Sequence, residues 1–314
     1  MNFLVIPSIR KDSIQHFLIE WKDVGGWDAV ILVEDNPTKT FEVDVNYHFS
    51  WKEIDEELKA DSWIISRRDS AIRCFGFYKA WQLGAKNIFT LDDDCLPTFD
   101  SFCKEHIQNL HHTSKWGESV LGYRTRGLPY RNKGCLTNVK FSMGLWQGVP
   151  DFDAIQMFKF EDQPSIELTK TRLMPRNQYF PFCGMNFAFT SDVTPLTYFP
   201  LMGMNSPYGR FDDIWFGIIC KKVCDHLDYH IACGKPYIFH SKASDAFNNL
   251  VKEAPGIKFN ENFWEIIDGI ELKTRTPISC MKEIGQNLEG HENDYLKKLG
   301  QAICIWANLF IPNP

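Results

Sequence analysis

Short apolar runs alternate with amphipathic segments through the first part of the chain. The runs at 3–9, 28–35 and 87–91 have the length and composition of buried strands. Between them, apolar side chains recur at helical spacing in residues 12–21 and 69–85. Strands that alternate with helices predict a parallel sheet in an α/β domain.

The last of these apolar runs leads directly into three consecutive acids, Asp92, Asp93 and Asp94. Ligands of parallel sheets bind beyond the carboxyl ends of the strands, where Asp35 is also expected. Neighbouring carboxylates repel one another unless a cation lies between them, so Asp92 and Asp94 predict a divalent metal site. The alternative is a solvent-exposed acidic turn. No GxGxxG motif follows a strand, which argues against a flavin or NAD site.

Two further places combine chemically active residues. His240 ends another predicted strand, with Lys242 two residues later, and together they suit a metal ligand and a phosphate-binding cation. A structural histidine is the alternative. Asp212 and Asp213 precede a helical pattern, where one is expected to cap the helix and the other to act as a catalytic carboxylate, with Arg210 holding it ionised.

The middle of the chain is rich in glycine, proline and basic residues. Guanidinium groups match phosphate oxygens, so these residues are candidates for a phosphate clamp, with a solvated loop as the alternative. The basic residues of this loop are Arg124, Arg126, Arg131 and Lys133, and Arg10 and Arg73 are expected to contribute in the same way.

Composition excludes several other classes of protein. A net charge of −6 argues against a nucleic-acid-coating role. The ten cysteines contain no CxxC pair, so we expect free thiols rather than a zinc site. The N-terminus has no basic segment followed by an apolar one, and no run of apolar residues is long enough to span a membrane. We therefore expect a cytoplasmic protein.

Nine sequence blocks occur in the order of one known family. They are VIPSIR, DNPTKT, RDSAIRCFGF, IFTLDDDC, TRGLPY, GLWQGVPDFDA, FCGMNFAF, GRFDDIWFGIICKKVCDHL and PYIFHSKAS. Together they resemble the reversibly glycosylated polypeptides, which include the plant UDP-arabinopyranose mutases. The resemblance implies a GT-A-like nucleotide-diphospho-sugar transferase fold, α/β with a mostly parallel central sheet, over residues 1–255. Residues 256–314 are expected to form a helical extension that packs on it.

The resemblance also implies an activity. The family interconverts the pyranose and furanose forms of UDP-arabinose without flavin, so UDP-L-arabinose is the expected substrate. Alternatives are a glycosyltransferase or self-glycosylating protein, and a non-catalytic UDP-sugar-binding partner. Assembly into homo- or hetero-oligomers is left open.

The implied site residues fall into three groups. Mn²⁺ or Mg²⁺ is expected on Asp92, Asp94 and His240. Arg126 matches the arginine that the family associates with reversible glycosylation, whereas Lys133 stands where the family has a second arginine. The expected catalytic residues are Arg126, Asp212 and Asp213, and the expected substrate-binding residues are Arg10, Asp35, Asp69, Arg73, Asp93, Lys133 and Lys242.

Overall fold

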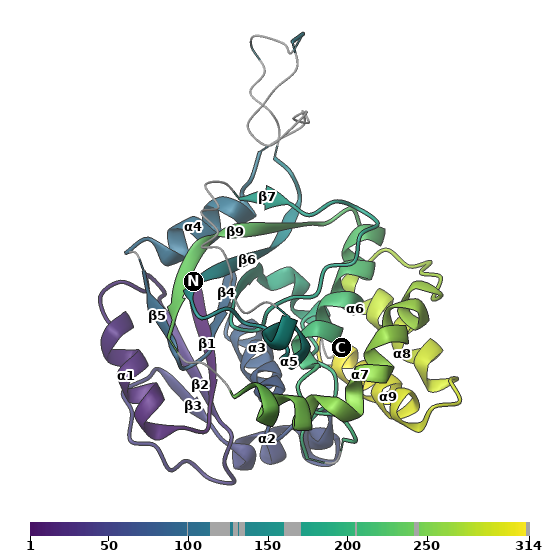
Figure 1. The fold of residues 1–314 in the computed structure, drawn as a ribbon, viewed down its shortest axis with the longest axis horizontal. Helices are drawn as coiled ribbons and strands as arrows, with labels where there is room; N and C mark the ends of the chain where they lie inside the picture. The colour runs from purple at the N-terminus through teal and green to yellow at the C-terminus, as the bar shows by residue number, and fades with distance from the viewer. Residues whose placement is uncertain are drawn as a thin grey trace.

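A mixed β-sheet forms the centre of the protein in this computed structural model (Figure 1). The structure describes residues 1–98, 100–113, 126–127, 131, 136–159, 171–204, 206–241 and 245–311. Within them the strand order is β3-β2-β1-β4-β8-β6-β9-β5, and β7 pairs with β9. The strands are β1 (Asn2–Ser8), β2 (Ala29–Glu34), β3 (Tyr47–Phe49), β4 (Asn87–Leu91), β5 (Cys95–Pro97), β6 (Val139–Gly148), β7 (Arg172–Leu173), β8 (Asn186–Thr190) and β9 (His230–His240).

The N-terminal half of the sheet is parallel. β1 pairs in parallel with β2 and β4, and β2 pairs in parallel with β3. β8 then lies antiparallel between β4 and β6, while β6 and β9 are parallel again. The predicted α/β class is confirmed, and the strands predicted at 3–9, 28–35 and 87–91 correspond to β1, β2 and β4. The antiparallel strands come from the later half of the chain.

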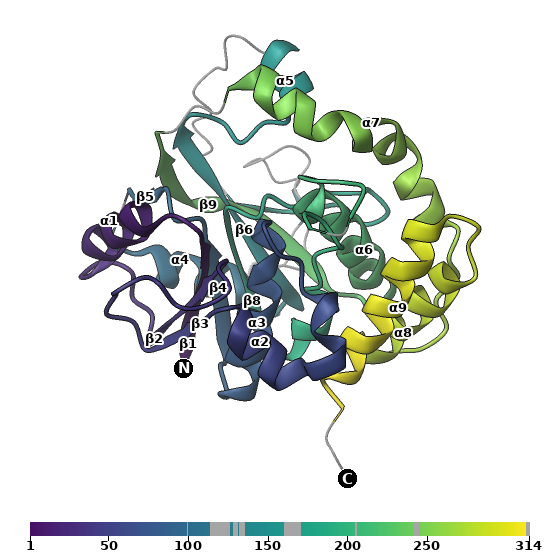
Figure 2. The same cartoon turned by 90° about the horizontal axis from the view of Figure 1, so that it is seen from below.

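Helices cover both faces of the sheet. Figure 2 shows α1 and α4 on one face and α3 and α6 on the other. No described helix is long and apolar enough to cross a membrane. The helices are α1 (Lys11–Trp21), α2 (Trp51–Leu58), α3 (Arg73–Gln82), α4 (Phe102–Leu110), α5 (Ala154–Lys159), α6 (Asp212–His226), α7 (Ala246–Asp268), α8 (Pro277–Glu289) and α9 (Asp294–Asn308), with short 3₁₀ turns η1 (Lys59–Ile64), η2 (Ser70–Ile72) and η3 (Ser191–Leu196).

Close packing of α3 on the sheet fixes the start of that helix near the acids. A Cβ atom on Gly76 would lie 2.4 Å from Val5 Cγ1 and 2.9 Å from Val33 Cγ2, so only glycine allows this approach. The Asp69 carboxylate accepts a hydrogen bond from Ala71 N at 2.9 Å and caps the 3₁₀ turn η2, which leads into α3. The first turn of α3 is thereby held at the carboxyl edge of β1 and β4.

The C-terminal helices pack on the α/β core, as expected. The indole of Trp306, which is fully buried, donates to Pro195 O at 2.9 Å, and Tyr295 donates to Leu201 O at 3.0 Å. α8 and α9 lie side by side (Figure 2). α7 runs without a break across residue 255, so no element ends at the boundary drawn from the sequence. The division into two units remains a prediction.

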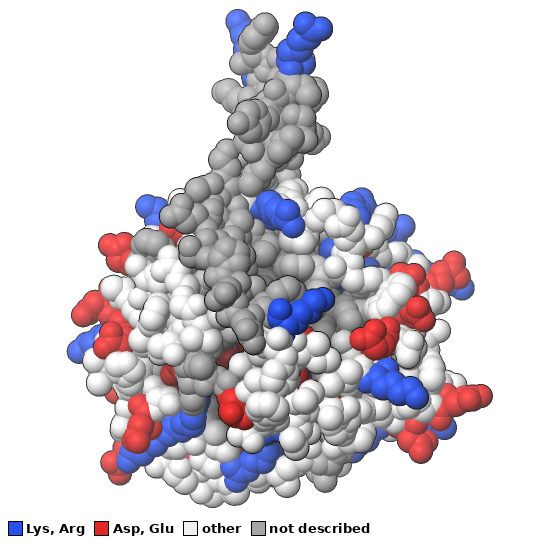
Figure 3. Space-filling model, viewed as in Figure 1, with Lys and Arg blue, Asp and Glu red and all other residues white. Residues whose placement is uncertain are grey.

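Charges of both signs are spread over the surface. Figure 3 shows Lys and Arg side chains interspersed with Asp and Glu side chains on the face viewed in Figure 1.

Candidate active site

A pocket of about 350 Å³ lies beyond the carboxyl ends of β1, β2 and β4. This is the rim on which the sequence placed its acidic residues, and segments far apart in the chain meet there. The expected site residues that line the pocket are Arg10, Asp35, Asp69, Asp92 and Asp93, and they are joined by Arg68, Ser70 and Arg210.

Arg10 forms ion pairs with two of the three consecutive acids, Asp93 and Asp94. Its guanidinium pairs with Asp93 and donates to Asp94 Oδ2 at 3.0 Å. The Ser8 hydroxyl also donates to Asp93, at 2.5 Å. Burial raises the pKa of Asp93, and the bonds from Arg10 and Ser8 oppose that rise. Arg10, predicted to bind substrate, therefore holds the acidic segment in place.

Arg73 lies beneath the acids rather than at the surface of the pocket. Its side chain is 1% exposed and pairs with Asp92. Its other donors reach Ser70 O at 3.0 Å, Thr90 Oγ1 at 3.1 Å and Gly184 O. All of these partners belong to the protein, so its contacts are those of a buried counter-ion for the carboxylates. Its predicted contact with substrate stays a prediction.

Asp94 and His240 face one another. β5 pairs antiparallel with β9 so that Cys95 lies opposite His240, which brings the end of β9 next to Asp94. His240 Nε2 lies 4.0 Å from Asp94 Oδ1. His240 Nδ1 donates to Val149 O at 3.0 Å, because a carbonyl oxygen only accepts, and this bond orients the ring so that Nε2 lies on the side of Asp94.

The pair of Asp94 and His240 fits a divalent metal ion, but Asp92 does not complete a set of three. Among the described residues, the group whose three ligand atoms all lie within 4.8 Å of one another is Asp151, Cys183 and Asp213. Ligands at about 2.1 Å from one ion can lie up to about 4.2 Å apart, which matches the distance between Asp94 and His240. Carboxylate oxygen and imidazole nitrogen are both ligands of Mn²⁺. Asp92, whose side chain is 33% exposed, is the third predicted ligand.

Asp212 and Asp213 begin α6 and are held differently. Asp212 accepts from Ser70 Oγ at 2.6 Å, whereas Asp213 accepts from Gly184 N and from Ile214 N, both at 2.8 Å. Burial raises the pKa of both carboxyls, and the charge of Asp212 adds to the effect on Asp213, whose pKa lies well above its usual range. The prediction that one of this pair caps the helix is wrong, because the N-cap residue of α6 is Phe211 and both acids lie within the first turn.

The sequence did not indicate Asp151 and Cys183 as site residues. The ligand atoms of Asp151, Cys183 and Asp213 all lie within 4.8 Å of one another. The thiol of Cys183 donates to Asp151 Oδ2 at 2.6 Å, and burial raises the pKa of Cys183 well above its usual range. Both residues stand in blocks that carry the family resemblance, but nothing in their spacing indicates that they meet.

Arg68 and Arg210 are the other cations lining the pocket. Both are non-glycine residues with positive φ, 60° for Arg68 and 70° for Arg210, a conformation that costs energy and is concentrated at functional sites. The Arg68 guanidinium lies 5.1 Å from the ring centroid of Trp51. Arg210 Nε lies 3.6 Å from Oε1 of the buried Glu253. The sequence analysis singled out Arg210, as a partner of Asp212 and Asp213, but did not indicate Arg68.

Four of the predicted basic residues cannot be placed against the pocket. Arg126 is exposed, and no contact joins it to the acidic residues of the pocket within the described part of the chain. Lys133 and Lys242 lie outside the described residues, as does Arg124. Their predicted roles remain predictions.

The sequence of one family matches almost the whole chain. A family model described as "Reversibly glycosylated polypeptide" matches residues 3–312. The chain belongs to this family. UDP-arabinopyranose mutase 1 of Oryza sativa subsp. japonica is 35% identical over 96% of this chain and 88% of its own. UDP-arabinopyranose mutase 2 of Arabidopsis thaliana is 34% identical over 96% of this chain and 89% of its own.

Among solved structures, this reversibly glycosylated polypeptide has a distant likeness to glucosyl-3-phosphoglycerate synthase from Mycobacterium tuberculosis. That structure is a complex with Mn²⁺, UDP and glucosyl-3-phosphoglycerate. The TM-score is 0.49 at 11% identity, with 84% of this chain and 79% of that chain covered.

Proposed function

We propose that this protein is a metal-dependent, flavin-independent mutase that interconverts the pyranose and furanose forms of UDP-L-arabinose. The observation that carries the proposal is the carboxyl edge of the sheet. Asp92, Arg68 and Arg210 line the pocket there, Asp94 faces His240, and Asp212 accepts a hydrogen bond from the lining residue Ser70. Relatives about a third identical over nearly their whole length carry the name of this reaction. The cytoplasmic location expected from the sequence is part of the same proposal.

Asp92, Asp94 and His240 would hold Mn²⁺ or Mg²⁺ at the end of β4. Such an ion, when bound, stabilises negative charge that develops on a leaving diphosphate. The pairs that Arg10 and Arg73 make with these acids keep the carboxylates ordered, so the site needs little rearrangement to receive a cation.

Arg68 and Arg210 would contact the diphosphate of the nucleotide. Arg10 and Arg73 are already paired with carboxylates, whereas Arg210 makes only one loose contact with Glu253, at 3.6 Å. Its guanidinium is 42% exposed and lines the pocket. A planar guanidinium can donate two parallel hydrogen bonds to phosphate oxygens.

Ring contraction requires a bond at the anomeric carbon to break and re-form. The C1–O bond to UDP breaks with both electrons going to the β-phosphate, and C1 becomes electron-poor. O4 then bonds to C1 and loses its proton, the C1–O5 bond breaks, and O5 gains a proton. A β-phosphate oxygen returns to C1 and gives the furanose isomer. No atom is lost or gained overall.

The two carboxyls at the start of α6 suit the proton movements. Burial and the charge of Asp212 raise the pKa of Asp213 well above its usual range, which favours this group as the proton donor to O5. The bond from Ser70 and the charge of Arg73 oppose the rise in the pKa of Asp212, so this group is the better acceptor for the O4 proton. A pair of carboxyls with different pKa values can serve as acid and base in one site.

An acceptor-free assay tests this function. The purified protein would be incubated with UDP-arabinopyranose and Mn²⁺, and the nucleotide sugars resolved by chromatography. A mutase gives the furanose isomer while the total amount of nucleotide sugar stays constant. Release of UDP without an isomer would indicate a hydrolase or a self-glycosylating protein. Binding without any turnover would indicate a transferase that lacks its acceptor or a non-catalytic partner.

A further inference from the structure

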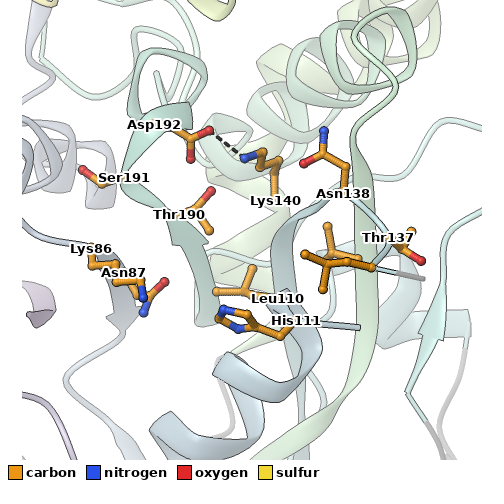
Figure 4. Close-up of a pocket in the computed structure, with 12 residues that line it drawn as sticks. Lys86, Asn87, Leu110, His111, Thr137, Asn138, Lys140, Thr190, Ser191 and Asp192 are labelled. Carbon is orange, nitrogen blue, oxygen red and sulfur yellow. Dashed lines mark hydrogen bonds and ion pairs between the residues drawn. The ribbon is translucent and has the colours of Figure 1, made fainter. Parts of the chain in front are cut away.

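Two pockets differ in how a cation in their wall is paired. The pocket in Figure 4, of about 630 Å³, shares no lining residue with the candidate active site. There Lys140 Nζ lies 2.6 Å from Asp192 Oδ2, a close ion pair that leaves little charge for a ligand. In the candidate active site, Arg210 Nε lies 3.6 Å from Oε1 of Glu253. No other ion pair or hydrogen bond of this guanidinium occurs among the described residues, so its two terminal nitrogens can bind phosphate oxygens.

Glu253 is a buried acid on α7 whose two carboxylate oxygens face different segments. Its side chain is 4% exposed. Oε2 accepts a hydrogen bond from Ala154 N at 2.8 Å, at the start of α5, whereas Oε1 faces Arg210. Burial raises the pKa of Glu253, and the bond from Ala154 N and the charge of Arg210 oppose that rise. The carboxylate thus joins α7 to α5 and to the wall of the active site.

α7 also packs closely on the backbone next to Arg210. A Cβ atom on Gly256 would lie 2.4 Å from Phe211 Cε2, so a larger residue would push the helix away. The ring of Phe211 stacks on Trp215, with centroids 5.2 Å apart, and Trp215 stacks on Phe263 of α7 at 4.9 Å. The same helix therefore contacts both the side chain of this arginine and the residue that follows it.

These contacts account for the strained backbone of Arg210. Its φ of 70° costs a non-glycine residue about 1–3 kcal/mol and persists only where the surroundings enforce it. A guanidinium is planar, so a carboxylate beside Nε restricts the directions in which the terminal nitrogens point. The side chain is thereby prepared for one orientation before any ligand binds.

We propose that Glu253 is a positioning residue that orients the Arg210 guanidinium toward the diphosphate of the nucleotide. The carboxylate attracts Nε and leaves the two terminal nitrogens as a fork for phosphate oxygens. This inference rests on the function proposed above, in which Arg210 contacts the diphosphate. It gives α7 a part in nucleotide binding, although the residues that line the pocket include none from this helix.

Calorimetric titration with UDP in the presence of Mn²⁺ tests this role in four proteins: the unchanged protein, Glu253→Gln, Arg210→Gln and the double variant. Glutamine keeps the shape of the side chain, and its oxygen can still accept from Ala154 N, but its amide nitrogen then faces Arg210 Nε. Glu253→Gln should weaken UDP binding about fivefold, within the range of coupling between residues in contact. In the Arg210→Gln background the same change should alter the affinity less than about twofold.

Two further variants separate positioning from a purely structural role. Glu253→Asp keeps the charge and should bind UDP more tightly than Glu253→Gln, whereas a role through shape alone gives the reverse order. Glu261→Gln removes an exposed acid from the same helix and should bind UDP as the unchanged protein does. Thermal melting verifies that each variant is folded, and titration with Mn²⁺ alone should give the same affinity in all of them.

The inference is overturned if Glu253→Gln binds UDP as tightly as the unchanged protein. It is also overturned if Glu253→Gln loses as much affinity in the Arg210→Gln background as in the unchanged one. In both results the unchanged protein binds UDP, so the proposed function is not affected. Absence of UDP binding by the unchanged protein would instead overturn that function and this inference together.

Discussion

Asp94 Oδ1 lies 4.0 Å from His240 Nε2, although the first residue follows β4 and the second ends β9. The antiparallel pair of β5 and β9 creates this proximity, and the Val149 carbonyl orients the imidazole. Both groups thus point toward one space, which is the arrangement a shared metal ion requires.

Replacing Asp94 tests the metal assignment. Asp94→Asn should weaken Mn²⁺-dependent UDP binding at least tenfold, because it removes a charged ligand while keeping the shape of the side chain. Asp294→Asn is a matched control, since the carboxyl of Asp294 is fully exposed. Calorimetry with and without Mn²⁺ measures the effect. Equal affinities in the two variants would refute the assignment.

Replacing Arg210 tests the diphosphate contact. Arg210→Gln should weaken UDP binding about tenfold, the value of one charge-assisted hydrogen bond, while leaving the affinity for Mn²⁺ alone unchanged. Lys258→Gln removes an exposed positive charge from α7 and serves as the control. If both variants bind UDP as the unchanged protein does, Arg210 does not contact the diphosphate.

Arg73 and Asp92 should be energetically coupled. Removing the buried guanidinium alone, in Arg73→Met, leaves buried carboxylates without a counter-ion and should lower the free energy of unfolding by about 3 kcal/mol. The double variant Arg73→Met/Asp92→Asn should lose less than the sum of the single losses, by about 1–3 kcal/mol. Urea unfolding measures all four proteins. Strict additivity would show that the pair does not act as a unit.

His106 should make stability depend on pH. It lies fully buried between Ser142 Oγ at 2.8 Å and Asn186 Oδ1 at 3.0 Å, and burial lowers its pKa to about 3. As pH falls below about 6.5, the unfolded chain binds a proton that the folded state excludes, so stability is lost progressively down to about pH 3. Between pH 7 and pH 5 the loss from this group should be about 2 kcal/mol.

The variant His106→Gln isolates this contribution. Urea unfolding at the two pH values should show a smaller decrease in the variant than in the unchanged protein, because glutamine does not titrate. The same decrease in both would mean that His106 is not the group responsible.

The pattern of apolar residues along the chain predicted those parts of the fold that are determined by residues close together in the sequence. The apolar runs before Asp35 and Asp92 indicated β2 and β4, and their order along the chain placed both acids on one edge. Pairing of β5 with β9, which brings His240 to Asp94, depends on contacts between distant segments and has no local signature. Its place at the end of a predicted strand made His240 a candidate metal ligand, but nothing in the local sequence indicated that it meets Asp94.

Burial explains contacts of the charged residues that the sequence did not predict. Arg10 follows the first strand and Arg73 lies near the start of a helix, which made them candidates for substrate contacts. Their actual contacts are with Asp93, Asp94 and Asp92, because a group of carboxylates in a partly buried rim needs counter-ions within the protein. The strained backbone of Arg68 likewise has no signal in the sequence.

Positional isotope exchange tests the central claim most directly. UDP-arabinopyranose carrying ¹⁸O in the oxygen that bridges C1 and the β-phosphorus would be incubated with the protein and Mn²⁺, and the label followed by ³¹P NMR. If the C1–O bond breaks and re-forms in this pocket, ¹⁸O should move to the non-bridging positions as the furanose isomer appears, and neither should occur in Asp94→Asn. A furanose isomer whose label stays in the bridge would contradict the account.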